Sequence, residues 1–298
     1  LRRGPVGPMS NKTVIPLNQS QLYKLTSPRR LADVLGLAEA ELRAMATGPD
    51  RYRQFEIEKK SGGKRPVEDP VAPLKRVQGR IAKMLARIEP PSFLFCPVKG
   101  RCYVSNAARH RGNRVVHCLD IKKFFPNTPR VRVIAFFQSI MGCRADVAGL
   151  LGDLCTFEGH LPTGSPLSPM LAYYSYHDMW AEIAAFCTAK GYTLTVYVDD
   201  VTISGAKVPV ADVWHVRRMI HRTGLRYHKL KHYVDRPAEI TGVVVRDGKV
   251  VVPNRQRLKH RQTRLALQQP GSGDQRLKGR LSGLAGQMRQ IDSMNEPG

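Results

Sequence analysis

The chain has 298 residues, enough to bury the core of one large domain or of two to three small ones. Its 48 Lys and Arg outnumber its 24 Asp and Glu, which gives a net charge of +24 and favours a polyanionic partner, with nucleic acid ahead of an anionic membrane surface. No apolar stretch is long enough to span a membrane and no secretion signal opens the chain, so a cytoplasmic protein is expected. The six cysteines form no CxxC pair, which argues against a structural zinc site.

The first ninety residues are expected to contain a leader, helices and a β-hairpin. Helical spacing of apolar residues defines the helices, and alternation of apolar and polar residues followed by a glycine turn defines the hairpin. In chain order, we expect a tag remnant or disordered leader at 1–8, an N-terminal helical region at 9–50, a strand at 53–58, a basic turn at 61–64 and a helix at 71–88.

The middle of the chain alternates strands and helices. A strand is expected at 115–121, with the carboxylate of Asp120 near its end, and Thr128-Pro129 can cap a helix that runs to Ile140. The elements that follow are helices at 145–157 and 168–190, a Gly/Pro-rich connector at 159–169 between them, and strands at 192–198 and 201–204. Asp199 and Asp200 are therefore expected at the tip of a hairpin.

The last third is expected to hold a helix at 213–223, strands at 225–234 and 241–252, and basic helices from Asn254 onward. The second strand would turn at Asp247-Gly248. This order of elements indicates an α+β sheet domain with helices on one face, and places the domain core at 51–252 and a helical piece at 253–298.

Three carboxylates are candidate metal ligands. Taken alone, Asp199-Asp200 is more typical of an ordinary turn, and Asp120 of a strand end or helix N-cap. However, no Lys or Arg occurs from Gly191 to Ala206 to neutralise a partly buried pair. If the strands are neighbours, the three carboxylates can converge on two divalent cations about 3.5 to 4 Å apart, the arrangement used in nucleotidyl transfer.

Three motifs, in this order along the chain, resemble those of reverse transcriptases. Leu119-Asp120-Ile121 with Phe124-Phe125-Pro126 resembles the first catalytic motif, Leu161 to Pro166 the substrate-side motif, and Tyr197 to Asp200 the second catalytic motif. The resemblance runs from about Tyr52 to Val252. Two further segments resemble motifs of the retron branch: Asn106 to His110, and Ile240-Thr241-Gly242.

The resemblance implies a right-hand polymerase fold with fingers, palm and a small helical thumb. It implies an RNA-directed DNA polymerase that copies part of a structured non-coding RNA into covalently linked single-stranded DNA (msDNA). The implied partners are this RNA and its msDNA, dNTPs, two Mg²⁺ ions for which Mn²⁺ can substitute, and an effector protein in antiphage defence.

The resemblance also implies roles for single residues at the reaction centre. Asp120 and Asp199 would be the main metal ligands, with Asp200 a third carboxylate and the carbonyl of Ile121 a backbone ligand. Phe125 would be the steric gate against a ribose 2′-hydroxyl, with a core aromatic as the alternative. Further contacts to nucleotide would come from Lys64, Arg65, Gly164, Ser165 and Pro166, and the acid catalyst for pyrophosphate would be Lys231.

Nucleic acid is expected to contact two other groups of residues. By resemblance, Asn106, His110, Thr241 and Gly242 would hold the template RNA; without it, Asn106 reads as a turn residue and His110 as a core histidine. The charge pattern adds a basic thumb, with Leu258 and Leu265 facing the sheet. Its cations are Arg255, Arg257, Lys259, Arg261 and Arg264. The alternative is a solvated helix face.

Two other functions stay open. The chain could be a different reverse transcriptase, of the group II intron or diversity-generating type, which the RNA product would discriminate. It could also be a non-catalytic RNA-binding scaffold, which would explain the charge. Thr163 departs from the resemblance, since it stands where glutamine is usual, and this leaves the contact normally made at that position in doubt.

Overall fold

The computed structural model describes residues 14–58, 62–268 and 274–296. The chain divides into two compact units, each built from two stretches of sequence: Leu1–Pro91 with Phe125–Tyr176, and Ser92–Phe124 with His177–Gly298. The expected leader at 1–8 and the first residue of the expected turn, Ser61, lie outside the described residues. The two units cut across the domain limits expected at 51 and 253, which therefore remain a proposal.

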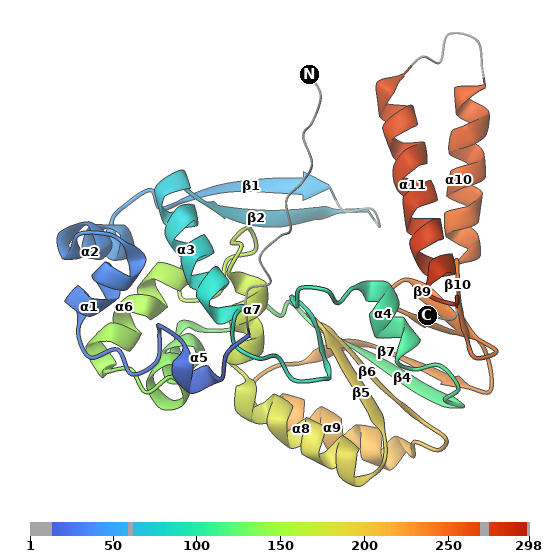
Figure 1. Cartoon of the computed structure of the whole chain (residues 1–298), viewed down its shortest axis with the longest axis horizontal. Helices are drawn as coiled ribbons and strands as arrows, with labels where there is room; N and C mark the ends of the chain where they lie inside the picture. The colour runs from blue at the N-terminus through green and yellow to red at the C-terminus, as the bar shows by residue number, and fades with distance from the viewer. Residues whose placement is uncertain (1–13, 59–61, 269–273, 297–298) are drawn as a thin grey trace. The chain divides into compact units, whose positions relative to one another are not determined.

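The first unit combines helices with one antiparallel hairpin (Figure 1). Its elements are η1 (Leu17–Gln19), α1 (Pro28–Leu35), α2 (Glu39–Thr47), β1 (Tyr52–Glu58), β2 (Lys64–Pro70), α3 (Ala72–Leu85), α5 (Arg130–Ala135), η2 (Phe136–Ile140), α6 (Ala145–Cys155) and α7 (Ser168–Tyr174). The hydroxyl of Ser27 accepts a hydrogen bond from Arg30 N and caps α1, as the Ser-Pro pair predicts. Gly36, with φ +65°, ends α1, so the N-terminal helical region consists of two helices.

The second unit is built on a five-stranded sheet with the order β3-β5-β6-β4-β7, in which β3 and β5 are parallel and the other pairs antiparallel. A three-stranded sheet, β10-β9-β8, accompanies it. The elements are β3 (Leu94–Cys96), α4 (Tyr103–Ala108), β4 (Val115–Ile121), α8 (His177–Ala189), β5 (Thr193–Tyr197), β6 (Asp200–Gly205), α9 (Val210–Arg222), β7 (Tyr227–Val234), β8 (Ala238–Ile240), β9 (Val243–Arg246), β10 (Lys249–Val251), α10 (Asn254–Leu267) and α11 (Gln275–Ser293). None of the helices in the described ranges is long and apolar enough to cross a membrane.

The two faces of the five-stranded sheet differ in character because side chains alternate along each strand. Leu119 and Ile121 of β4 are buried on the face that α8 and α9 cover (Figure 1). Val116, Cys118 and Asp120 point to the other face, where Val116 joins an apolar core with α4, the small sheet and α11. That second face carries the polar residues considered below.

The structure corrects three sequence-based expectations. The helix expected at 168–190 is two helices, α7 and α8, because the chain breaks around the fully buried Tyr176, where no glycine or proline signals a break. The strand expected at 241–252 begins only at Val243, since Thr241 and Gly242 form a turn. Leu258 and Leu265 do not face the sheet: α10 packs on α11, and both leucines are about half exposed, at 54% and 49%.

Candidate active site

The pairing of four strands places three of the predicted catalytic residues, Asp120, Asp200 and Lys231, in two adjacent rows. Residues directly opposite each other in antiparallel strands share a face of the sheet. Opposite one another across β5, β6, β4 and β7 lie Tyr197, Asp200, Asp120 and Lys229. One step further along the strands, the same face carries Thr195, Thr202, Cys118 and Lys231. Register alone therefore sets two carboxylates side by side with two lysines on the neighbouring strand.

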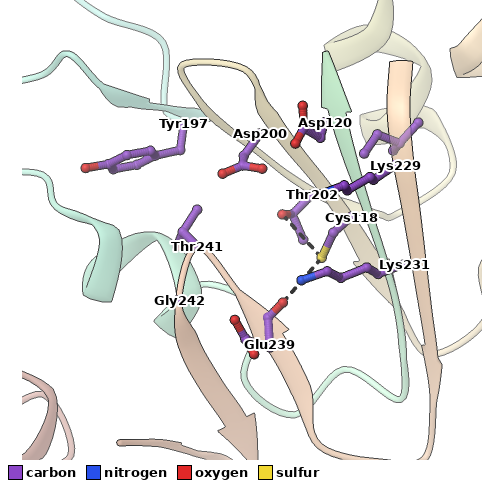
Figure 2. A pocket seen from close by; sticks show the side chains of 11 residues that line it. Cys118, Asp120, Tyr197, Asp200, Thr202, Lys229, Lys231, Glu239, Thr241 and Gly242 are labelled. Atoms are coloured by element: carbon purple, nitrogen blue, oxygen red, sulfur yellow. Dashed lines mark hydrogen bonds between the residues drawn. The ribbon is translucent and has the colours of Figure 1, made fainter. Parts of the chain in front are cut away.

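A cavity of about 290 Å³ lies over these two rows (Figure 2). Residues of both rows line it together with Leu119, Glu239, Thr241 and Gly242. In Figure 2 the Asp120 and Asp200 carboxylates lie near each other at one end, with Lys231, Cys118 and Glu239 at the other. Cys118 Sγ donates to the Glu239 carbonyl (3.9 Å), and Thr202 Oγ1 donates to Cys118 Sγ (3.9 Å).

The turn that carries Asp199 is strained. Tyr197 pairs with Asp200, so Val198 and Asp199 form a two-residue turn, and Val198 has φ +58°, a region that β-branched residues rarely adopt. Ile121 N donates to the Asp199 carbonyl at 2.8 Å and ties the turn to the end of β4. A bulge between Asp120 and Ile121 in the pairing with β7 marks the same point. The three predicted metal-binding aspartates thus belong to one connected backbone corner.

Burial and neighbouring charges perturb the carboxylate of Asp200. Its pKa is raised to about 6, first by burial, then by the negative charges of Asp199 and Asp120, while Lys231 lowers it. Burial also raises the pKa of the Cys118 thiol to about 11, so this cysteine is neutral at pH 7. Carboxylates this close together repel one another, and a bound cation would reduce that repulsion.

The residues present fit a hard divalent cation. Mg²⁺ takes one or two carboxylates from the protein and fills its remaining positions with water and substrate oxygens. Asp120 and Asp200 face each other on adjacent strands, and the backbone of Asp199 is fixed beside them. Within the described residues, no three His, Cys, Asp or Glu side chains are grouped closely enough to hold a metal by themselves. Water and substrate would therefore have to complete the coordination.

Asn106 and His110 are buried, so the structure does not support the direct RNA contact expected of their side chains. His110 is fully buried; its Nδ1 lies 2.6 Å from Ser204 Oγ and its Nε2 2.8 Å from Thr195 Oγ1. Burial lowers its pKa to about 3, so the ring is neutral and links β5 to β6. Asn106 Nδ2 donates to Thr241 Oγ1 at 3.2 Å. Both residues therefore stabilise the strands and the turn that form the cavity.

Thr241 and Gly242 do reach the cavity, because they form the two-residue turn between β8 and β9. Both have positive φ, +46° and +86°, which is the signature of a type I′ turn. The Thr241 hydroxyl donates to the carbonyl of Tyr103 (3.1 Å). Thr241 and Gly242 are therefore accessible from the cavity, and their contact with nucleic acid stays a prediction.

The predicted nucleotide contacts Lys64, Arg65 and Phe125 belong to the first unit. Both basic residues are exposed on β2, and Lys64 Nζ forms an ion pair with Glu56 at 3.0 Å. Phe125 is half-buried and its carbonyl accepts from Thr128 N (2.9 Å), whereas the preceding Phe124 is buried edge-on against Trp180 in the second unit. The roles of these three residues stay predictions.

The substrate-side motif is fastened to β2 by a local network. Gly164 N donates to the Glu68 carbonyl (3.1 Å), and a Cβ at Gly164 would lie 2.6 Å from that oxygen, so the close approach requires glycine. Thr163, the departure from the usual glutamine, donates its hydroxyl to the Pro66 carbonyl and accepts from Glu68 N. Its side chain is thus engaged with β2.

Ser165 and Pro166, the other predicted contacts of this motif, differ in exposure. The Ser165 hydroxyl is buried and donates to Gln78 Oε1 at 2.6 Å, so it is committed to the core and does not support the predicted nucleotide contact. Pro166 is exposed. The helix that this pair was expected to start begins at Ser168.

The predicted thumb cations all lie on α10. They are Arg255, Arg257, Lys259, Arg261 and Arg264, and every one is exposed. Arg255 forms an ion pair with Glu239 (2.6 Å), a residue of the cavity lining, and so links α10 to the site. The other four are available to a polyanion, and this contact stays a prediction.

Sequence reasoning missed several residues of the cavity. Lys229 lies opposite Asp120, and Cys118, Thr202 and Glu239 line the same space. A signal for Lys229 was present, because residues two apart in a strand share a face and Lys229 is two residues before Lys231. The same alternation gives Thr202, two residues after Asp200, and Cys118, two residues before Asp120.

Comparisons with known proteins agree with this site. The family model described as "Reverse transcriptase (RNA-dependent DNA polymerase)" matches residues 57–243, more than half of the chain. Among curated proteins, the chain is 28% identical over 224 residues to Retron Se72 reverse transcriptase of Salmonella heidelberg (strain 579083-10), covering 70% of this chain and 59% of that protein. It is 29% identical over 243 residues to Retron Ec48 reverse transcriptase of Escherichia coli, covering 74% and 59%.

A third relative, Retron Mx65 reverse transcriptase of Myxococcus xanthus, is 32% identical over 222 residues, covering 65% of this chain and 51% of that protein. The chain thus spans between half and three fifths of the length of these three relatives. The expected α+β polymerase fold and the resemblance to retron reverse transcriptases are confirmed. The chain belongs to the reverse transcriptase family.

Proposed function

We propose that the chain is an RNA-directed DNA polymerase of the retron type. The observation that carries this proposal is the row Tyr197, Asp200, Asp120 and Lys229, which sets two facing carboxylates over a cavity in a chain that matches the reverse transcriptase family. The same row argues against a non-catalytic scaffold, since binding RNA does not require a partly buried carboxylate with a raised pKa.

The chain's own residues would perform three tasks. Asp120, Asp199 and Asp200 would hold two Mg²⁺ ions, or Mn²⁺ in their place, which supply activation of the attacking hydroxyl and charge neutralisation on the triphosphate. Lys231 lines the same cavity as the carboxylates and would give a proton to the departing pyrophosphate. The turn at Thr241 and Gly242 would position the RNA end from which synthesis starts.

The finer part of the proposal comes from the likeness to retron enzymes. The template would be part of a structured non-coding RNA, and the product would be single-stranded DNA covalently linked to that RNA. The hydrogen bond from Asn106 Nδ2 to Thr241 Oγ1 supports this assignment, because it joins the two segments that resemble retron motifs. A role in antiphage defence with an effector protein, in the cytoplasm, completes the proposal.

Primer extension on an RNA template with dNTPs and MgCl₂ tests the activity. Asp120→Asn and Asp200→Asn should each lower the rate by at least about 10³-fold, because each removes a charge that the metal site requires. Asp247→Asn is the matched control, since Asp247 is 87% exposed on the β9-β10 turn. Equal rates for wild type and Asp120→Asn would refute the polymerase. Sequencing the RNA and DNA that co-purify with the protein tests the retron assignment.

A further inference from the structure

A second concentration of positive charge lies on and around α9. From Lys207 to Arg226 the sequence has five Lys and Arg and two His but one acidic residue, Asp212. Asp212 is already engaged, because it accepts from the Tyr192 hydroxyl (2.6 Å) and pairs with Lys190 (3.3 Å). α9 covers the sheet face that carries Leu119 and Ile121, whereas the Asp120 cavity opens on the opposite face. This charge is therefore not part of the catalytic site.

The surface of α9 contains a hollow of about 520 Å³. It is lined by His215, Arg218, Met219, His221 and Arg222. Arg218 donates to His215 Nδ1 (3.2 Å), and Arg222 pairs with Glu182 of α8 (2.5 Å), so both guanidinium groups are oriented at the surface while remaining exposed. His221 Nε2 is buried and has no hydrogen-bond partner among the described residues. The hollow thus offers oriented cations and one unpaired polar atom.

Aromatic rings flank these cations. The Arg217 guanidinium lies 3.6 Å from the ring centroid of Trp214 and 4.0 Å from that of Tyr227, and Tyr227 stacks on His221 at 5.5 Å with an interplanar angle of 8°. Arg217 is buried by this arrangement, but Trp214 is 51% exposed. A buried cation behind an exposed indole holds the ring in place at little further entropic cost. Trp214 is therefore a fixed stacking platform, connected through Arg217 and Tyr227 to His221 of the basic hollow.

We propose that α9 binds a single-stranded segment of RNA, with Trp214 stacking on a base and Arg218 and Arg222 contacting adjacent phosphates. Oriented cations beside an exposed aromatic ring are the combination that binds single strands without reading their sequence. An acidic peptide would satisfy the arginines and leave the indole without a role. The inference rests on the proposed function only for the identity of the RNA, which would be a segment outside the copied region.

Tryptophan fluorescence reports the stacking directly. The chain has two tryptophans, and Trp180 is fully buried, so a ligand that stacks on the protein surface quenches Trp214. Titration with a twelve-nucleotide oligouridylate should quench the tryptophan fluorescence of the wild type. The variant Trp214→Phe should show no quenching. The variant Trp214→Ala should bind the oligonucleotide roughly five-fold or more weakly than the wild type. No RNA-induced quenching in the wild type would overturn the proposal.

The phosphate contacts are tested by charge-matched double variants. Arg218→Gln with Arg222→Gln should lower the slope of log affinity against log salt by about 1.4, since each phosphate on a single strand contributes about 0.7. Arg246→Gln with Lys249→Gln removes the same charge from an exposed turn of the same unit, and in each pair one arginine has an acidic partner. Equal slopes for the two doubles would overturn the proposal.

Primer extension by the wild type separates this inference from the proposed function. Quenching and slope differences without extension would leave α9 as an RNA-binding surface and remove the polymerase. Extension without quenching would do the reverse.

Discussion

Asp200 lies near two other carboxylates, Asp199 and Asp120, whose negative charges help to raise the pKa of Asp200. Its pKa of about 6 lies above the ordinary value of 3.8, so the folded state favours the protonated acid. The stability that this preference contributes is fully present below pH 3.8 and is lost as the pH rises through 6. At neutral pH the ionised Asp200 carboxylate therefore lowers the stability of the metal-free protein.

Asp200→Asn should consequently stabilise the metal-free protein. In EDTA at pH 8 we expect its free energy of unfolding to exceed that of the wild type by about 1 to 2 kcal/mol, and we expect the difference to vanish near pH 4. Urea denaturation at both pH values measures it, with Asp247→Asn as the exposed control. Adding Mg²⁺ should stabilise the wild type more than the variant. A variant less stable than the wild type at pH 8 would contradict this view of Asp200.

His110 should show the opposite dependence on pH. Its folded pKa of about 3 lies below the ordinary 6.5, so its contribution to stability is present above pH 6.5 and is lost as the pH falls toward 3. Between pH 7 and pH 4 this loss is about 3 kcal/mol at most. Denaturation at a series of pH values should show a smaller acid destabilisation for His110→Gln than for the wild type. The same substitution at the exposed His228 is the control, and a profile for His110→Gln parallel to that of the wild type would contradict the prediction.

Sequence patterns identified site residues well when the residue type itself indicated the chemistry. They identified site residues poorly when strand register determined which residues lie opposite each other. Asp120, Asp199 and Asp200 were predicted from carboxylate type and motif order, and the structure brings their backbones together. Alternation could place Lys229 on the face of Lys231, but its position opposite Asp120 depends on the pairing of β4 with β7, which no local pattern determines. A core histidine was the alternative stated for His110, and the structure agrees with that alternative; its partners could not be found locally, since the Thr195 and Ser204 hydroxyls lie 85 and 94 residues away.

At the scale of elements, the strands near the site were predictable and the corners were not. Alternation of apolar and polar residues predicted β1, and apolar or β-rich runs predicted β4, β5 and β7, all to within two residues. The turn at Thr241 and Gly242 was not predicted, because Thr241 adopts a positive φ that its type disfavours and that Asn106 and Tyr103 stabilise by hydrogen bonds. Tertiary contacts decide such positions.

The connector before α7 offers a test at this scale. Gly164→Ala places a methyl 2.6 Å from the Glu68 carbonyl, a backbone atom that cannot move aside cheaply, so we expect a loss of about 1 to 3 kcal/mol in stability. Gly149→Ala is the matched control: a Cβ there meets nothing within 4 Å in the middle of α6, and it should stabilise by up to about 1 kcal/mol. Thermal unfolding of both variants measures this difference in stability. Equal unfolding midpoints would show that the backbone around Gly164 moves to accommodate the methyl group.

At the scale of the whole molecule, the net charge of +24 comes from cations on many separate elements. Acidic residues already hold some of these cations, as Asp69 holds Lys75 at 2.5 Å and Asp235 holds Arg114 at 2.8 Å. Ion pairs of this kind at the surface contribute little to stability and leave less charge for a polyanion. The cations that matter for binding are therefore those presented together on one element.

The exposed arginines of α10 provide the last prediction. Arg257, Arg261 and Arg264 follow one another at spacings of four and three, which places them on one side of the helix. If this side contacts a duplex between template and product, replacing all three by Gln should lower the salt slope of duplex affinity by about 2.7, at about 0.9 per phosphate.

A control with the same loss of charge is Arg29→Gln, Arg30→Gln and Lys83→Gln, three exposed residues of the first unit. Fluorescence anisotropy with a labelled RNA–DNA duplex between 50 and 200 mM salt, the range in which about six phosphate contacts change affinity by about 10³-fold, resolves such a difference. General attraction by net charge would lower both slopes equally. A drop confined to the α10 variant would instead place the duplex against this helix, because counterion release counts the phosphates that are contacted and not the distant charges of the protein.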